Sequence, residues 1–236
     1  ADSFSGTTGH RLTSRDLSMH ALPSDRAATW RLARLCLATF IAYLSIAVPL
    51  PVLPVFVRDT LQQSNLVVGC VIGVQFVATV LTRGLAGRIA DTRGPARAMR
   101  LGCLLLAASG ATYLLAATLP GAALPLLIIG RLATGMGESL LVTGMLAWGI
   151  GTVGQPRAGR VMTWVGLAIF ASLAVGAPIG VAMAQSWGFT AVAGACLLVP
   201  LLAWAMTAGV PAPQPVAGAR LPLRDVLVRI ALPAVV

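Results

Sequence analysis

The fold class is decided by residues 35–57, LCLATFIAYLSIAVPLPVLPVFV, which run for 23 residues without a charged side chain. An α-helix rises about 1.5 Å per residue, so about 20 apolar residues cross the hydrocarbon core of a bilayer. Similar stretches recur along the 236 residues, of which 57% are hydrophobic and only 10% are charged. An average globular chain has roughly 25% charged residues. This composition excludes a water-soluble domain and predicts an all-α polytopic membrane protein.

The apolar stretches divide into six predicted transmembrane helices, because polar turns and helix-breaking residues such as Pro120-Gly121 separate them. The predicted spans, within a bundle of residues 30–209, are residues 35–57, 66–86, 101–119, 122–149, 161–184 and 188–209. The polar residues 1–29 are predicted to form a disordered cytoplasmic leader. A cytoplasmic linker is predicted for residues 210–220, and residues 221–236 are interpreted as the start of a truncated seventh helix.

The distribution of arginine predicts the orientation of these spans. All 17 basic residues are arginines, and 14 of them fall in the leader and in the loops on one side of the predicted bundle. Only Arg58 lies on the other side, while Arg83 and Arg131 lie within spans. Cytoplasmic loops carry the excess of positive charge in membrane proteins. The N-terminus is therefore predicted to be cytoplasmic, and the net charge of +10 is interpreted as topology and lipid contact rather than nucleic-acid binding.

Several kinds of chemistry find no support in the sequence. The four cysteines lie in separate apolar stretches and both histidines lie in the N-terminal tail, so no clustered metal ligands are predicted. The chain has no lysine and therefore no nucleotide-binding G-x-x-x-x-G-K-[ST] loop. We expect neither an enzyme nor a cofactor.

The loop between the second and third spans, GRIADTRGPAR, begins at Gly87. It places Asp91 four residues after that glycine, followed by Arg93, Gly94 and Arg97. This arrangement resembles a signature of the major facilitator superfamily, in which a glycine is followed four residues later by aspartate and then by glycine and basic residues. The resemblance implies a gate that closes the cytoplasmic side by ionic contacts with the other half of the transporter.

The fourth span carries RLATGMGES, beginning at Arg131. Glu138 lies seven residues on, close to two helical turns, which places both side chains on one side of the helix roughly 10 Å apart. Ionisable groups inside a membrane usually serve function. The motif is similar to a second signature of the superfamily, an arginine followed by glycines at the positions of Gly135 and Gly137. The resemblance implies that Arg131 takes part in proton coupling. We expect Glu138 to carry the proton, with its charge state alternating during transport, and we assign Gln75, in the middle of span two, to the same pathway.

The fifth span carries Gly176-Ala177-Pro178-Ile179-Gly180. Small residues four apart let helices approach closely, and proline bends a helix. We therefore predict a helix-packing motif of Gly135, Gly137, Gly176, Pro178 and Gly180. In antiporter branches of the superfamily, a Gly/Pro-rich fifth span is associated with export. Other polar residues of the spans that could line a cavity are individually more typical of helix packing: Tyr43, Ser45, Thr79, Thr143 and Trp148.

The two signatures together imply six helices forming the N-terminal half of a twelve-helix major facilitator fold, built as 3+3 inverted repeats. The chain resembles bacterial sugar-efflux and drug-efflux-like proton antiporters, which implies export of a small organic solute by alternating access, driven by the proton gradient. The expected partners are membrane lipid, the solute and a C-terminal half of the same chain, in the bacterial inner membrane. An alternative is a compact six-span exporter or membrane structural subunit that acts as a dimer.

Overall fold

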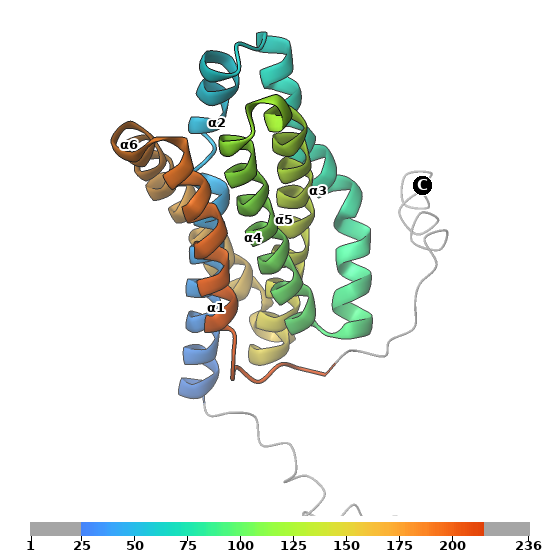
Figure 1. The fold of residues 1–236 in the computed structure, drawn as a ribbon. Coiled ribbons are helices and arrows are strands. Elements are labelled where there is room, and N and C mark those ends of the chain that lie inside the picture. Colours follow the sequence, from blue (N-terminus) through green and yellow to red (C-terminus); the bar gives the residue numbers. More distant parts are fainter. Residues whose placement is uncertain (1–24, 215–236) are drawn as a thin grey trace, which may run out of the picture.

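The structure, a computed structural model, describes residues 25–214, and within them the chain is helical with no strand (Figure 1). The long helices are α1 (Asp25–Ala47), α3 (Asn65–Arg93), α4 (Pro95–Thr118), α5 (Ala123–Val153) and α6 (Ala158–Met206). The short elements are α2 (Val52–Val55), a π-helix (Phe56–Thr60) and two 3-10 turns (Pro120–Ala122 and Gln155–Arg157). Five helices of the described residues are long and apolar enough to cross a membrane. The predicted all-α membrane class is confirmed.

The N-terminal helix differs from its predicted bounds. It begins at Asp25, so residues 25–29, which we assigned to the leader, are helical. It ends at Ala47, inside the predicted first span, and a turn precedes α2. Proline has no backbone N–H to donate, which explains why the helix breaks near Pro49 and Pro51. The remaining leader residues, most of the predicted linker and the predicted seventh helix lie outside the described residues.

The fifth and sixth predicted spans form one element, α6, which turns back on itself at Gly188. Gly188 has φ 75° and ψ 179°, a conformation that glycine adopts without steric penalty. Val161 and Ala203, near opposite ends of α6, pack in one apolar cluster with α1. Phe189, just after the break, instead stacks on Phe56 with 4.0 Å between ring centroids. The two arms of α6 therefore run in opposite directions, as Figure 1 shows.

Helix α5 is the packing centre of the bundle, because α4 lies along one side of it and α3 along another. The α4–α5 contact is close enough to bring backbone against backbone. A Cβ atom added to Gly102 would lie 2.6 Å from the Leu141 nitrogen, and one added to Gly144 would lie 2.5 Å from the Met99 nitrogen. Helix α1 packs against α6 and α5, and it does not pack along α3 within the described residues.

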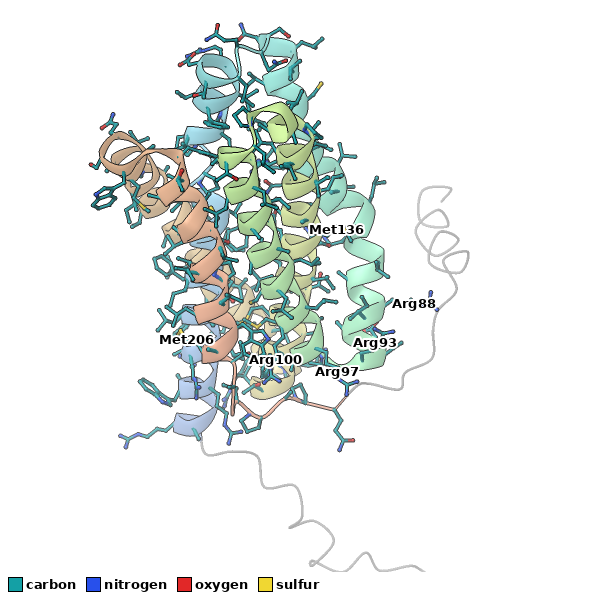
Figure 2. All side chains as sticks on the ribbon, in the orientation of Figure 1. Arg88, Arg93, Arg97, Arg100, Met136 and Met206 are labelled. Carbon is teal, nitrogen blue, oxygen red and sulfur yellow. The ribbon has the colours of Figure 1, made fainter. Side chains whose placement is uncertain are left out.

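Side chains of three other helices bind the end of α6 and the chain that follows it. Arg34 of α1 donates to the carbonyls of Met206 and Ala208, at 2.9 and 2.8 Å. Arg100 of α4 donates to the hydroxyl and the carbonyl of Thr207, both at 3.0 Å. Figure 2 shows Arg100 and Met206 at this lower end of the molecule. We call Arg34, Arg100 and Trp148 the basal clamp.

Trp148 of α5 completes the basal clamp. Its indole N–H donates to the Pro211 carbonyl at 3.0 Å, and the Arg100 guanidinium lies 5.9 Å from the centre of its ring. The last carbonyls of a helix have no partner within the helix, and the negative end of the helix dipole attracts cations. The basal clamp supplies both donors and positive charge at the end of α6. Residues 206–211 are thereby held against the bundle.

Substituting Arg100 tests the basal clamp. Arg100→Gln removes charged donors to Thr207 and the cation over Trp148, so we expect the melting temperature of the full-length protein in detergent to fall by several degrees. Arg97→Gln is the matched control, because Arg97 lies on the same helix and is exposed. Equal melting temperatures for the two variants would contradict a stabilising role for the basal clamp.

Candidate functional site

The central feature of the candidate site is the carboxylate of Glu138, which accepts hydrogen bonds from two neighbouring helices. The Tyr43 hydroxyl of α1 donates to Oε1 at 2.8 Å. From α3, the Gln75 amide donates to Oε2 at 3.0 Å, and the Thr79 hydroxyl lies 3.2 Å from the same oxygen. We call Tyr43, Gln75, Thr79 and Glu138 the polar cluster. It joins α1, α3 and α5 in the interior of the bundle.

Close packing of α3 against α5 places Gln75 and Thr79 within reach of Glu138. Gly135 makes this possible, because an added Cβ atom would lie 2.8 Å from the Ala78 side chain and against the Gln75 carbonyl. The Thr79 hydroxyl also lies 3.0 Å from the Gln75 backbone carbonyl and 3.2 Å from the Gly135 carbonyl. Its single hydrogen can serve only one of these three acceptors at a time.

The chemistry of the polar cluster suits a negatively charged carboxylate. Every neighbour that bonds to Glu138 acts as a donor, and both carboxylate oxygens have a partner. Hydrogen bonds to a charged group are stronger than neutral ones, and more so away from water. Gaining a proton would turn one oxygen from an acceptor into a donor and would weaken the ties to α1 or α3. The Gln75 Oε1 atom is buried without a hydrogen-bond partner among the described residues, so it remains available to accept one.

Arg131 lies in a different environment from Glu138. It is completely buried, with 0% of its surface exposed, beside Tyr113 of α4 and Cys196 of α6. The Tyr113 hydroxyl lies 3.1 Å from that of Thr134. None of the three guanidinium nitrogens makes a hydrogen bond of good geometry within residues 25–214. No hydrogen bond or ion pair between Arg131 and Glu138 is present in this part of the chain.

The residues of the predicted gate lie at the junction of α3 and α4. Gly94 joins these two helices with φ 93°, and Pro95 begins α4. Asp91, Arg93 and Arg97 are exposed, and in the described structure none of them forms an ion pair. Figure 2 shows Arg93 and Arg97 together at the lower end of α3 and α4. An added Cβ atom on Gly87 would meet nothing within 4 Å, so this face of α3 is open.

The predicted packing glycines lie at helix contacts. A Cβ atom on Gly137 would lie 2.9 Å from the Gly102 carbonyl of α4. On α6, one on Gly176 would lie 2.5 Å from the Ala47 side chain, and one on Gly180 would meet the Val48 carbonyl. Pro178, between these two glycines, lies exposed inside α6.

Comparison with known proteins identifies the family. The sequence model that describes the Major Facilitator Superfamily as a family matches residues 35–234 of the chain. The chain belongs to the Major Facilitator Superfamily. A Salmonella typhimurium protein named as an uncharacterized MFS-type transporter is 40% identical over 199 residues, covering 83% of this chain and 51% of that protein. A Burkholderia mallei protein of the same designation is 46% identical over 175 residues, covering 72% of this chain and 43% of the relative. The chain therefore spans about half the length of the curated relatives it matches.

Membership of the Major Facilitator Superfamily confirms the family predicted from the sequence and supports a membrane transporter. Glu138 was predicted from its position in the fourth span, about two helical turns after Arg131, but the sequence alone did not single out all of its partners. Tyr43 and Thr79 were noted only as residues that could line a cavity. Their signal was a polar group in an apolar span, which many packing residues share.

Removing the Tyr43 hydroxyl tests its bond to Glu138. Tyr43→Phe takes away the hydroxyl that donates to Oε1, so this oxygen of the Glu138 carboxyl group loses its protein partner and becomes more open to a reagent. Dicyclohexylcarbodiimide reacts with protonated carboxyl groups in apolar surroundings. We expect its attachment to Glu138 in the full-length protein, measured by mass spectrometry, to increase. Tyr113→Phe is the control, because that hydroxyl bonds to Thr134 instead; equal labelling in both variants would argue against the Tyr43 contact.

Gly135→Val tests the close contact between α3 and α5. The added side chain would push against Ala78 and the Gln75 carbonyl, so we expect a lower melting temperature and lower yield of folded protein. Gly194→Val is the matched control, since its added Cβ atom would meet nothing within 4 Å. A Gly135 variant as stable as the Gly194 variant would rule out this contact.

Proposed function

We propose that the chain is part of a proton-coupled transporter that exports a small organic solute, drug-like or sugar-like, by alternating access. The observation that carries this proposal is the Glu138 carboxylate held by donors from α1 and α3. Glu138 is the only glutamate in the chain, and it lies half-buried near the middle of α5. A carboxylate in a span is unfavourable unless it is hydrogen bonded or takes part in function.

Coupling follows from what a proton would do to the polar cluster. The charged carboxylate accepts from Tyr43 and Gln75 and so ties α1 and α3 to α5. A protonated carboxyl has one acceptor fewer and brings a donor of its own, so these ties weaken and the helices become free to shift. In this proposal Arg131 supports the cycle electrostatically from the core of the bundle, as the superfamily signature implies.

The remaining elements of the proposal concern the complete transporter. Helix α6 with its reversal at Gly188 would contribute two of six spans, arranged as 3+3 inverted repeats. These spans would rock against a C-terminal half, and the relatives, about twice as long as the aligned region, support such a half. Solute would bind between the halves near the bilayer midplane. The gate of Gly87, Asp91, Arg93, Gly94 and Arg97 would close the cytoplasmic side.

We further propose that the protein lies in the bacterial inner membrane with its N-terminus in the cytoplasm. In this proposal the proton gradient supplies the energy for transport, and no cofactor is required. No cluster of three or more metal-ligating side chains occurs among the described residues. The Gly/Pro-rich run from Gly176 to Gly180 supports export rather than uptake. Membrane lipid and the transported solute are the expected partners.

Glu138→Gln tests proton coupling in the full-length protein. Proteoliposomes loaded with a pH-sensitive dye would receive ethidium, norfloxacin, lactose or arabinose, with and without an imposed proton gradient. We expect at least one solute to move protons and to be transported against its gradient, and Glu138→Gln to abolish both. Exchange of solute across the membrane without net proton flux should survive, because the neutral amide imitates the protonated carboxyl.

Asp59→Asn is the control, because Asp59 forms an exposed ion pair with Arg58 and no hydrogen bond joins it to the polar cluster in the described structure. This variant should transport like the unmodified protein. Proton-driven transport with unchanged pH dependence in Glu138→Gln would refute the proposed role of the carboxylate.

A further inference from the structure

Three of the charged side chains within the described transmembrane helices are Arg83, Arg131 and Glu138. They differ in what they can offer to a solute. Arg131 is completely buried, and both carboxylate oxygens of Glu138 are already bonded to protein donors. Arg83 is exposed. Of these three charges, only Arg83 presents an accessible and unoccupied charged group.

The position of Arg83 relates it to the polar cluster. Gln75, Thr79 and Arg83 follow one another at intervals of four residues along α3, so each lies about 6 Å further along the helix and turned by about 40°. Arg83 thus stands one turn beyond Thr79 at the edge of the same face. The spacing therefore places Arg83 about one helical turn from the polar cluster, on the same helix as two of its members.

No protein group in the described structure neutralises Arg83. The single ion pair of residues 25–214 joins Arg58 to Asp59, and no hydrogen bond from the Arg83 guanidinium occurs there. A guanidinium inside a transmembrane segment is unfavourable unless it meets water or an anion. Its planar fork of N–H donors matches a carboxylate with two parallel hydrogen bonds.

We propose that Arg83 binds the carboxylate of the transported solute, so that the natural cargo is an organic anion; this rests on the transport function proposed above. Both Glu138 oxygens already accept from protein donors, whereas Arg83 has no partner in the described residues, so the charge that is not neutralised favours an anionic solute. A solute bound at Arg83 would lie within about one helical turn of Thr79. The solute would thus bind next to residues that donate hydrogen bonds to Glu138.

Binding measured without a proton gradient tests this inference separately from proton coupling. The full-length protein in phosphatidylcholine nanodiscs, which offer no anionic headgroup, would be titrated by tryptophan fluorescence with gluconate and glucose, lactate and propane-1,2-diol, and benzoate and benzyl alcohol. Each pair shares a carbon skeleton and differs in the carboxylate. We expect at least one carboxylate to bind at least about tenfold more tightly than its neutral partner.

Variants of Arg83 assign that preference to its guanidinium. Arg83→Gln should reduce carboxylate affinity to that of the neutral partner, and Arg83→Lys should retain part of the preference, because it keeps the charge without the fork. Arg88→Gln, an exposed arginine further along α3, should leave affinity unchanged. Melting temperatures of all variants establish that the protein is folded.

Three results would each overturn the inference. One is that the protein binds no carboxylate of the panel, and another is that it binds carboxylates and their neutral partners equally. The third is that Arg83→Gln leaves carboxylate binding unchanged. Adding phosphatidylglycerol to the nanodiscs distinguishes a lipid site, because competition by that lipid with no carboxylate preference would assign Arg83 to headgroups. Proton-driven transport of a neutral sugar without carboxylate binding would refute the inference and leave the proposed function standing. Carboxylate binding at Arg83 without proton coupling would support the inference and refute the proposed proton-coupled function.

Discussion

The hydrogen bonds from Tyr43 and Gln75 to Glu138 are the interaction on which the organisation of the bundle interior depends. A carboxylate in a membrane-spanning helix requires donors, because hydrocarbon supplies none. These donors come from α1 and α3, two helices that do not pack along each other in the described structure. The Glu138 side chain therefore links two helices that apolar packing leaves apart.

Close helix contacts make this arrangement possible. Within a bilayer, apolar side chains are as well solvated by lipid as by protein, so helices associate through close packing rather than water exclusion. Gly135 brings α3 against α5 beside Glu138, and Gly102 and Gly144 do the same for α4 and α5. The glycines thus determine which polar groups come within hydrogen-bond distance. On α5, the glycine that packs against α3 therefore lies within one helical turn of Glu138.

The sequence predicted what depends on composition along the chain and missed much of what depends on the rotation of helices about their axes. Apolar length predicted the membrane class, and the span-four motif predicted the family. The break after Ala47 was missed because three nearby prolines could each have ended the helix. Tyr43 was not assigned to Glu138, since that contact joins residues 95 positions apart and depends on how α1 is turned toward α5.

Arginine shows why residue type alone does not determine function in this chain. Arg34 and Arg100 donate hydrogen bonds to carbonyls at the end of α6, so they hold the backbone in place. Arg131 is enclosed by protein, and its nitrogens have no hydrogen-bond partner among the described residues. Arg83 has the same guanidinium but neither enclosure nor a partner in the described residues. The surroundings of each arginine therefore decide whether its charge stabilises the fold, influences a neighbour or is available to bind an anion.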